Sequence, residues 1–511
     1  MNENSTLTKT RFDADVVVVG AGPAGLMLAC ELRLAGVDVV LLERLSDIDS
    51  TIKAGAINVP TAVALDRRGL LEAAEAVQTA TLEKMFGGAD GAKQLMSVPR
   101  HMGHFAGIWF TGEEIDDTDP DFAGLGPAGE VRMVMQAQLE EILSERAARL
   151  GVDLRRGVGF EGCDADADGV TVTTSDGELR AAWLVGADGG RSPVRKAAGF
   201  DFPGTDGEIT GHQMVVDMDG SEGLRRGWNT TDTGVYVFGP FPGRVLTVEF
   251  GVPSLDRDAP ITVDEVQASI RNVTGVDVTV TKIHSATRFT DNARQASTYR
   301  KGRVLLAGDA AHVHSPFGGQ GLNLSFGDAM NLGWKLAATV QGWAPEGLLD
   351  TYTTERHPIG AWVLDWNRAQ VSIMRPDRHA RAMRAVMADL LETADGSTYV
   401  SKKISGIWQG YDMGGGHPLV GDSADNLKLA DGSALNDHLR EGRGLLLDLS
   451  EDAEIRAAAR GYDGRVTTVV ASTKEAPAAA LLVRPDGYIA WAGDTAEGLD
   501  KALAAWFGSP A

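Results

Sequence analysis

The first apolar stretch of the chain, Val16-Val17-Val18-Val19, has no polar residue on either alternating face and runs straight into a glycine-rich turn. A run of this kind predicts a strand of a parallel sheet that is buried on both faces. An apolar-rich stretch after the turn predicts a helix, and a second apolar run that ends at Glu43 predicts a second strand. The order strand, turn, helix, strand is a βαβ unit, so we expect an α/β fold with a parallel sheet.

Two later apolar runs have the same character, and each ends with an aspartate beside a glycine. The first ends in Asp188-Gly189 and the second in Gly308-Asp309. In open α/β sheets, ligands bind at the carboxyl ends of the strands. Both aspartates are therefore candidate ligand contacts.

The hydrophobic pattern changes in other parts of the chain. Polar and apolar residues alternate at 234–238 and 244–250, which predicts antiparallel strands. From about residue 345 to 395 the apolar positions recur at helical spacing, which predicts helices that pack the larger domains together. The stretch 481–491, with an Asp-Gly pair at its centre, predicts a β-hairpin.

The turn after the first strand carries the spacing Gly20, Gly22, Ala24, Gly25. The first glycine permits the sharp turn, the second lets the backbone approach a pyrophosphate, and the last lets the helix pack closely on the sheet. Free amides at the helix start bind the phosphates. Glu43 ends the second strand, where its carboxylate can accept hydrogen bonds from ribose hydroxyls. The pattern predicts a dinucleotide ligand but does not decide between FAD and NAD.

Together the three motifs resemble the triple signature of flavoprotein aromatic hydroxylases, the para-hydroxybenzoate hydroxylase family. The resemblance implies non-covalent FAD in a Rossmann-like, glutathione reductase-type domain, with Asp309 on the ribityl chain. It places Asp188 near the pyrophosphate and the route of the reduced nicotinamide, and the backbone of Leu322 and Asn323 near the negative charge of the reduced flavin. Further cofactor contacts that the family pattern implies are Arg44, Gln136, Gly308, Pro316, Gly319 and Gly321.

The sequence departs from the family pattern beside the flavin. Phe317 stands near a position where the family has a small residue, and Leu324-Ser325 replaces a Thr-Gly pair. Lys53 stands where similar enzymes carry arginine; it either keeps a positive charge near the flavin or is a solvated surface lysine. The catalytic candidates are Pro316, which lines the side of oxygen activation in the family, Phe317 and Lys53.

The resemblance covers nearly the whole chain and implies four parts. They are a discontinuous FAD-binding domain (1–80, 131–200 and 285–345), a substrate-binding domain with an antiparallel sheet (81–130 and 201–284), a helical connector (346–398) and a thioredoxin-like C-terminal domain (399–511). The last part has no C-x-x-C motif, so it carries no thiol redox chemistry. The substrate-contact candidates are Trp109, Trp228, Tyr236, Phe238 and Phe317, although aromatic side chains more often fill cores.

Composition narrows the range of partners. The 511 residues include 48 basic and 71 acidic side chains, a net charge of -23. This charge argues against binding to nucleic acids or anionic membranes. Cys30 and Cys163 are the only cysteines, so the sequence predicts neither a disulfide framework nor a metal site and fits the cytoplasm. A homodimer is compatible with this composition.

The resemblance implies a monooxygenase that takes hydride from NADPH or NADH, reacts with O2, and transfers one oxygen atom through a flavin C4a-hydroperoxide to an aromatic ring. The C-terminal part is similar to that of actinobacterial polyketide hydroxylases, which implies a multi-ring, polyketide-type substrate. Two alternatives remain open: Baeyer–Villiger oxygenation of a ketone, with Lys53 stabilising the oxyanion, and a flavin-loaded binding protein without turnover. A flavin halogenase is disfavoured because the W-x-W-x-I-P signature is absent.

Overall fold

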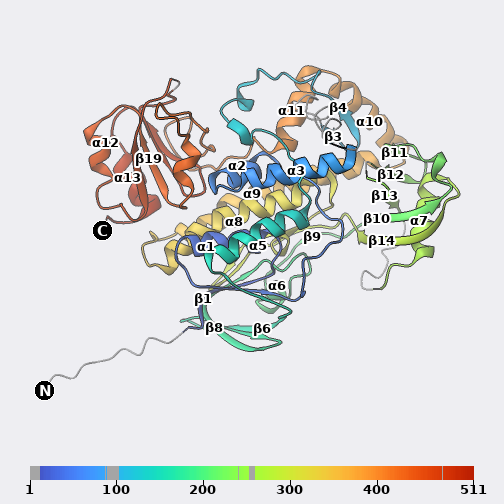
Figure 1. Cartoon of the computed structure of the whole chain (residues 1–511), viewed down its shortest axis with the longest axis horizontal. Helices are drawn as coiled ribbons and strands as arrows, with labels where there is room; N and C mark the ends of the chain where they lie inside the picture. Colours follow the sequence, from blue (N-terminus) through green and yellow to red (C-terminus); the bar gives the residue numbers. More distant parts are fainter. Residues whose placement is uncertain are drawn as a thin grey trace.

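The computed structural model describes residues 12–86, 88, 103–239, 241–251, 259–474 and 476–510. Residues 89–102, which belong to the expected substrate-binding segment 81–130, lie outside the described residues. Figure 1 shows an elongated molecule, with the C-terminal sheet at one end, an antiparallel sheet at the other and long helices between them.

The largest sheet contains the three apolar runs found in the sequence. Its path is β16-β17-β8-β1-β2-β5, and its strands from β17 to β5 are parallel. Strands β6 and β7 extend it in antiparallel fashion from β8. The strands are β1 (Ala14–Val19), β2 (Val39–Glu43), β5 (Asp153–Arg156), β6 (Phe160–Ala165), β7 (Val170–Thr174), β8 (Gly177–Gly186), β16 (Arg300–Lys301) and β17 (Val304–Leu306).

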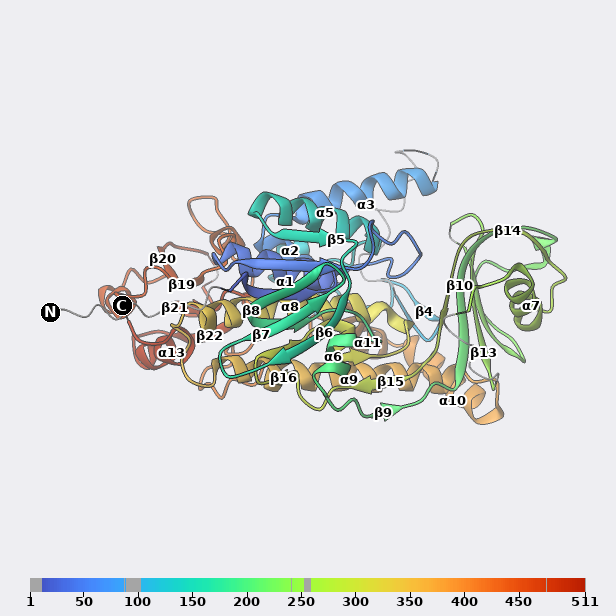
Figure 2. The ribbon, with the colours of Figure 1, turned by 90° about the horizontal axis from the view of Figure 1, so that it is seen from below.

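Helices α1 (Pro23–Leu34) and α5 (Gln136–Leu150) pack against this sheet, and α8 (Gln320–Val340) packs against α1. Figure 2 shows the strands β6, β7 and β8 in front of α1 and α8. Val16, Val17 and Val18 have no exposed surface, because the strand is covered on both faces. The expected βαβ opening and the α/β fold are confirmed.

The antiparallel sheet has the order β11-β12-β13-β10-β14. Helix α7 (Val263–Thr274) begins at the Thr262 cap and buries Val266, Ile270 and Val273 against one face of the sheet. The strands are β10 (Ile209–Asp219), β11 (Gly227–Thr230), β12 (Gly234–Phe238), β13 (Arg244–Phe250) and β14 (Thr279–Phe289). The alternating stretches in the sequence are thus antiparallel strands, as predicted.

Helices connect the two sheets to the C-terminal part. They are α9 (Thr351–Met374), α10 (Arg378–Leu391) and α11 (Ala394–Ser405), and α9 packs along α8. The remaining elements around them are α2 (Val59–Arg67), α3 (Leu71–Phe86), β3 (Gly103–Phe105), β4 (Ile108–Phe110), α6 (Pro193–Ala197), β9 (Gly204–Thr205), β15 (Ala293–Gln295) and β18 (His312–Val313). Among the described residues, no helix has the length and apolar character needed to cross a membrane.

The C-terminal sheet has the order β20-β19-β21-β22. Strands β21 and β22 form the predicted hairpin, with Gly487 in the turn at φ +88°. The elements are β19 (Gly444–Asp448), α12 (Ala453–Ala458), β20 (Val466–Val470), β21 (Ala480–Val483), β22 (Ile489–Gly493) and α13 (Leu499–Phe507). The thioredoxin-like identification and the domain boundaries stay predictions.

Two arginines at the end of α2 dock the C-terminal part. Arg67 donates to the carbonyl oxygens of Asp486 and Ala424 at 3.1 and 2.9 Å. Arg68 pairs with the buried Glu31 and donates to the carbonyl oxygen of Leu439 at 2.8 Å. Both guanidinium groups are buried, so no solvent separates the end of α2 from the C-terminal part at these side chains.

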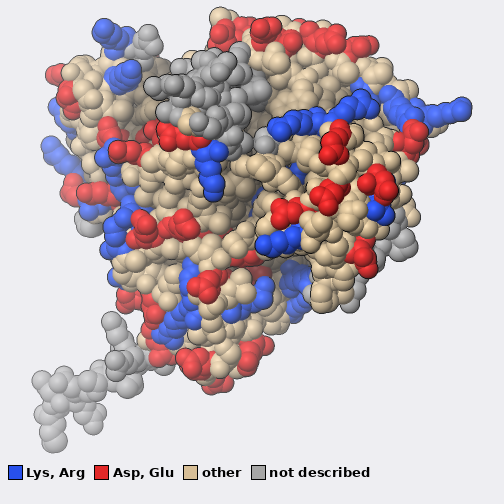
Figure 3. Space-filling model, turned by 45° about the vertical axis from the view of Figure 1, so that its right-hand side comes forward, with Lys and Arg blue, Asp and Glu red and all other residues tan. Residues whose placement is uncertain are grey.

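Surface charge is unevenly distributed. On the face shown in Figure 3, acidic side chains border the upper edge, while Lys and Arg lie among Asp and Glu below it. Uncharged side chains occupy much of the area between them.

Candidate active site

The three sequence motifs meet at the carboxyl ends of β1, β8 and β17. A Cβ built on Gly20 would lie 2.3 Å from the carbonyl oxygen of Ala187, so the first and second motifs are in close contact. A Cβ on Gly308 would lie 3.2 Å from the Cβ of Ala24, so the third motif packs against the start of α1. This convergence follows from the parallel strand order, which brings the three strand ends to one edge.

The glycines of the first motif have different functions. Gly25 has no room for a side chain, because a Cβ there would lie 1.8 Å from the carbonyl oxygen of Gly20. Gly22 faces open space, with no described atom within 4 Å of such a Cβ. Packing therefore explains Gly25 but not Gly22, and the open face at the start of α1 fits the close approach of a pyrophosphate.

Three further predicted cofactor contacts are Glu43 and Arg44 for the adenosine side and Gln136 for the ribityl chain. Glu43 accepts hydrogen bonds from the backbone amides of Ala21 at 2.8 Å and Leu45 at 2.9 Å. A carboxylate can accept about four hydrogen bonds, so two sites remain for ribose hydroxyls. Arg44 is exposed beside it, and Gln136, the first residue of α5, donates to Glu140 at 2.8 Å.

The two motif aspartates differ in their surroundings. Asp309 is exposed on a 3-10 turn after β17, and no described residue forms a hydrogen bond or ion pair with its carboxylate. Asp188 accepts a hydrogen bond from the amide of Val194 at 2.9 Å, at the start of α6, while its other oxygen is buried without a partner. Burial raises the pKa of Asp188. Asp309 is thus the freer of the two for a ligand hydroxyl.

A buried ion pair that the sequence analysis missed stabilises the Asp309 turn. Asp328 of α8 accepts from the amide of Gly308 at 3.0 Å, from His312 at 2.7 Å and from Arg356 at 2.8 Å. Burial alone would raise the pKa of Asp328, but His312 and Arg356 outweigh it and lower the pKa below its usual value. The available sequence signal was the presence of two charged residues, Asp328 and Lys335, in a helix with many apolar residues.

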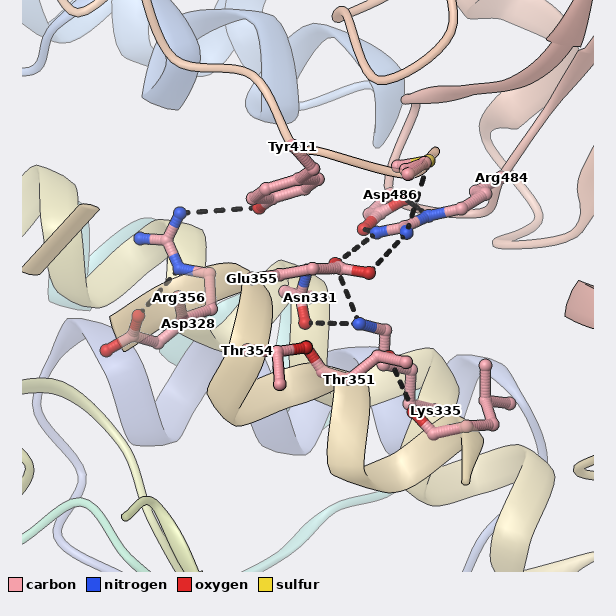
Figure 4. A network of polar contacts seen from close by, with 12 residues as sticks. Asp328, Asn331, Lys335, Thr351, Thr354, Glu355, Arg356, Tyr411, Arg484 and Asp486 are labelled. Atoms are coloured by element: carbon pink, nitrogen blue, oxygen red, sulfur yellow. Dashed lines mark hydrogen bonds and ion pairs between the residues drawn. The ribbon is translucent and has the colours of Figure 1, made fainter. Parts of the chain in front are cut away.

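This pair is part of a larger buried ionic network between α8, α9 and the C-terminal sheet, shown in Figure 4. We define the ionic network as Asp328, Lys335, Glu355, Arg356, Arg484 and Asp486. Glu355 pairs with Lys335 and with Arg484, each at 2.8 Å, and Arg484 also binds Asp486. Burial disfavours the charge on Glu355, but Arg484 and Lys335 lower its pKa to about 2.

The glycine-rich loop between β18 and α8, residues 314–319, is called the flavin loop. Gly318 and Gly319 have φ values of +77° and +64°, a left-handed conformation that glycine adopts without strain. The side chain of Asn323 donates to the carbonyl oxygen of Gly319 and accepts from the amide of Asn58, both at 2.8 Å. The loop is therefore fixed, and the first amides of α8 have no carbonyl partner within their own helix. Leu322, the third residue of α8, is one of these free donors, whereas the amide of Asn323, the fourth, is in position to bond to the Gly319 carbonyl. Both residues are predicted flavin contacts.

An aromatic cluster lies beyond this loop, on the face of the antiparallel sheet opposite α7. We define the aromatic cluster as Phe105, Phe110, Trp228, Phe289, Phe317 and Trp366. Phe317 is 2% exposed, and its ring centroid lies 5.9 Å from Phe289 and 6.3 Å from Trp228. It connects the loop to the cluster.

The predicted pocket residues divide between two faces of the sheet. Trp228 belongs to the aromatic cluster, and Trp109 is 53% exposed at its edge, with its ring against His104. Tyr236 and Phe238 point to the other face and pack against α7, which corrects their assignment to the pocket. The alternating pattern identified the strand, but it did not show which face meets the flavin loop.

Lys53 lies at the surface. Its side chain is 41% exposed, and its ammonium group pairs with Asp49 at 2.9 Å. This arrangement agrees with the surface alternative and neutralises the charge that a catalytic role would require.

Comparison with known proteins identifies the family. Residues 13–367 match the FAD binding domain family and residues 417–510 match the aromatic-ring hydroxylase C-terminal family. Rifampicin monooxygenase from Streptomyces venezuelae is 41% identical over 97% of this chain and 99% of its own length.

A tetracycline-pathway relative and a solved structure agree with this match. The 12-dehydrotetracycline 5-monooxygenase/anhydrotetracycline 6-monooxygenase from Streptomyces rimosus is 40% identical over 97% of this chain and 99% of its own length. The structure of OxyS anhydrotetracycline hydroxylase from Streptomyces rimosus matches with a TM-score of 0.85 and 38% identity, covering 98% of this chain and 100% of that one. The chain therefore belongs to the FAD-dependent aromatic-ring hydroxylases and is a flavoprotein monooxygenase.

Proposed function

We propose that the protein inserts one oxygen atom from O2 into a multi-ring aromatic substrate of the polyketide type, at the expense of NADPH or NADH. The observation that carries the proposal is the contact between the flavin loop and the aromatic cluster through Phe317. An aromatic cluster gives a fused ring system a large apolar contact area beside the cofactor. Relatives named for tetracycline precursors support a substrate of this size.

In this proposal the chain binds FAD along the edge where the three motifs meet. Gly22 admits the pyrophosphate, Glu43 and Arg44 contact the adenosine side, and Asp309 accepts a hydrogen bond from the ribityl chain. The amides of Leu322 and Asn323 stabilise negative charge on the ring. When bound, the flavin accepts hydride from the nicotinamide and activates O2.

The protein's own contribution is to position the substrate and to exclude water. Phe317 packs the loop against the aromatic cluster while the neighbouring Pro316 stays exposed, so Phe317 is the loop residue that would shield the reaction from water once a substrate is seated. The ion pair with Asp49 argues against Lys53 as an oxyanion donor, so ring hydroxylation is favoured over Baeyer–Villiger oxygenation. A homodimer and a cytoplasmic location remain predictions from the sequence.

The test begins with FAD affinity. Asp309→Ala should weaken FAD binding to the apoprotein by about 10- to 150-fold, because a hydrogen bond to a charged group contributes roughly 1.5–3 kcal/mol. Titration of FAD into apoprotein measures this change. Asp500→Ala, at an exposed aspartate of α13, is the control and should leave FAD affinity unchanged.

The second step tests turnover. Fused-ring aromatic compounds should stimulate NADPH oxidation by the FAD-loaded enzyme and yield a product that carries one atom of labelled O2. A protein that binds FAD but shows neither response would be a flavin-loaded binding protein, and the proposal would be rejected.

A further inference from the structure

Two nitrogen donors on α9 have no acceptor among the described residues. They are Nε1 of Trp366 and Nε2 of Gln370. Both atoms are buried, and Gln370 as a whole is 1% exposed. The residues are four positions apart, so their side chains lie on the same face of the helix. A buried unpaired donor is costly, and two on one face require an explanation.

The orientation of the Gln370 amide is set by its neighbour. Oε1 accepts a hydrogen bond from the amide of Ala106 at 3.1 Å, so Nε2 is the end without a partner. Ala106 has a φ of +50°, an uncommon conformation for a residue with a side chain. Arg384 donates to its carbonyl oxygen at 2.7 Å, which helps to hold this turn between β3 and β4.

Each donor lies beside the flavin loop or within the aromatic cluster. A Cβ built on Gly318 would lie 3.0 Å from Gln370 Nε2, so a side chain at this loop position would crowd the donor. The ring of Trp366 lies 4.7 Å from that of Phe105, inside the aromatic cluster. Between the two donors, Asn367 accepts a hydrogen bond from Ser315 at 3.0 Å and fixes the loop to the helix.

We propose that Trp366 and Gln370 are substrate-recognition residues that donate hydrogen bonds to carbonyl or phenolic oxygen atoms on a fused-ring aromatic substrate. The inference rests on the proposed function and names the feature of the substrate that the site recognises. Apolar side chains bind the ring faces, while the two donors fix where the oxygen atoms lie relative to the flavin loop. A site with unpaired donors discriminates strongly against an analogue that lacks acceptors.

The experiment measures binding to the FAD-loaded protein without NADPH, so it does not depend on turnover. The probes are a dihydroxyanthraquinone and anthracene, which share a three-ring shape but differ in oxygen acceptors. The wild type should bind the dihydroxyanthraquinone more tightly. Gln370→Glu and Trp366→Phe should each weaken that binding by about tenfold, the upper range for one neutral hydrogen bond, and should leave anthracene binding within about twofold.

The pH dependence of probe binding distinguishes the loss of a hydrogen-bond donor from a purely structural change. The carboxyl group introduced by Gln370→Glu keeps an acceptor for Ala106 but has no donor while it is ionised. Once protonated it regains an O–H donor, so the variant's affinity for the dihydroxyanthraquinone should recover toward the wild-type value as the pH falls. Trp366→Phe, which cannot be protonated, should show no such recovery relative to the wild type.

Two matched controls separate recognition from packing. Trp362→Phe changes the ring that stacks on Trp366 at 5.0 Å, and its indole nitrogen is not among the unpaired donors. Gln295→Glu makes the same amide-to-carboxyl change where Nε2 already donates to Tyr299 and His357. Both controls should preserve the preference for the oxygenated probe.

Three results would overturn the inference. The first is equal wild-type affinity for the two probes, or binding of neither. The second is an equal loss of affinity for both probes in Gln370→Glu. The third is a loss of FAD affinity in that variant, which would make the flavin the acceptor. Failure of the proposed function would instead appear as absent NADPH oxidation in a protein that still discriminates between the probes.

Discussion

One helix, α9, passes through two contrasting environments. Its N-terminal half carries Glu355 and Arg356 in the ionic network, and its C-terminal half carries Trp366, a member of the aromatic cluster, and the nearby Gln370. Arg356 and Gln370 are 14 positions apart, which corresponds to roughly 21 Å along the helix. In the first environment each charged side chain has an oppositely charged partner; in the second, two polar donors have none.

The difference shows which part of the site is complete before a ligand binds. Buried charges must be paired, so the network fixes Gly308 and the Asp309 turn in the apoprotein. The aromatic cluster packs through non-directional contacts and can exchange them for a substrate ring. We infer that the cofactor edge is preformed, whereas the substrate side is completed by the substrate.

The largest expected effect is on the ionic network. Arg484→Met should lower the free energy of unfolding by about 3–5 kcal/mol, because it leaves Asp486 buried without its cation and Glu355 with Lys335 alone. Urea denaturation measures the change. Arg440→Met removes an exposed pair with Asp437 in the same part of the chain and should cost under about 1 kcal/mol. A similar small loss for both would show that the network is not tightly coupled to folding.

Opening the aromatic cluster should affect both stability and chemistry. Phe317→Ala should lower the free energy of unfolding by about 3 kcal/mol and let water reach the reaction, so hydrogen peroxide per NADPH rises at the expense of product. Phe507→Ala leaves a comparable cavity in the fully buried core beside α13 and should not change that ratio. An unchanged ratio in Phe317→Ala would assign Phe317 to packing alone.

Two glycines of one motif should respond in opposite ways. Gly22→Val should weaken FAD binding by at least about tenfold, or 1.4 kcal/mol, without loss of apoprotein stability, because its side chain would enter open space where the pyrophosphate is expected. Gly25→Ala should destabilise the apoprotein itself, because its Cβ would overlap the Gly20 carbonyl. Thermal unfolding of both apoproteins and FAD titration distinguish the two. Full FAD occupancy in Gly22→Val would contradict the proposed pyrophosphate site.

The last expected effect is a pH dependence of stability from His104, whose ring packs against the aromatic cluster. Burial and the nearby Arg384 lower its pKa from 6.5 to about 4. The unfolded chain therefore binds a proton more readily, so the stability associated with neutral His104 is present above pH 6.5 and is lost as the pH falls through about 4. Within this window the group contributes a slope of at most about 1.4 kcal/mol per pH unit.

His104→Gln should flatten that slope. Urea denaturation of both proteins at a series of pH values from 7 to 4 provides the measurement. The lower end of this range matches the folded-state pKa of His104. An identical slope in the two proteins would mean that His104 titrates normally in the folded state.

The sequence by itself determined the parts of this protein that depend on local chemistry. Four consecutive valines predict a strand covered on both faces, and the glycine spacing with Glu43 predicts a dinucleotide site, because these patterns follow from strand geometry and close backbone approach. The two aspartate motifs lie at strand ends for the same reason. The family resemblance added FAD and the monooxygenase activity to this local information.

Tertiary structure decided everything that depends on which surfaces meet. Tyr236 and Trp228 are equivalent aromatic residues in the sequence, but pairing in the antiparallel sheet turns one toward α7 and the other toward the flavin loop. Glu355 and Arg484 are separated by more than a hundred residues, and only the docking of the C-terminal sheet against α9 brings them into one network. Packing decides which face of a sheet a side chain occupies and which distant residue it contacts, and no local sequence pattern encodes either.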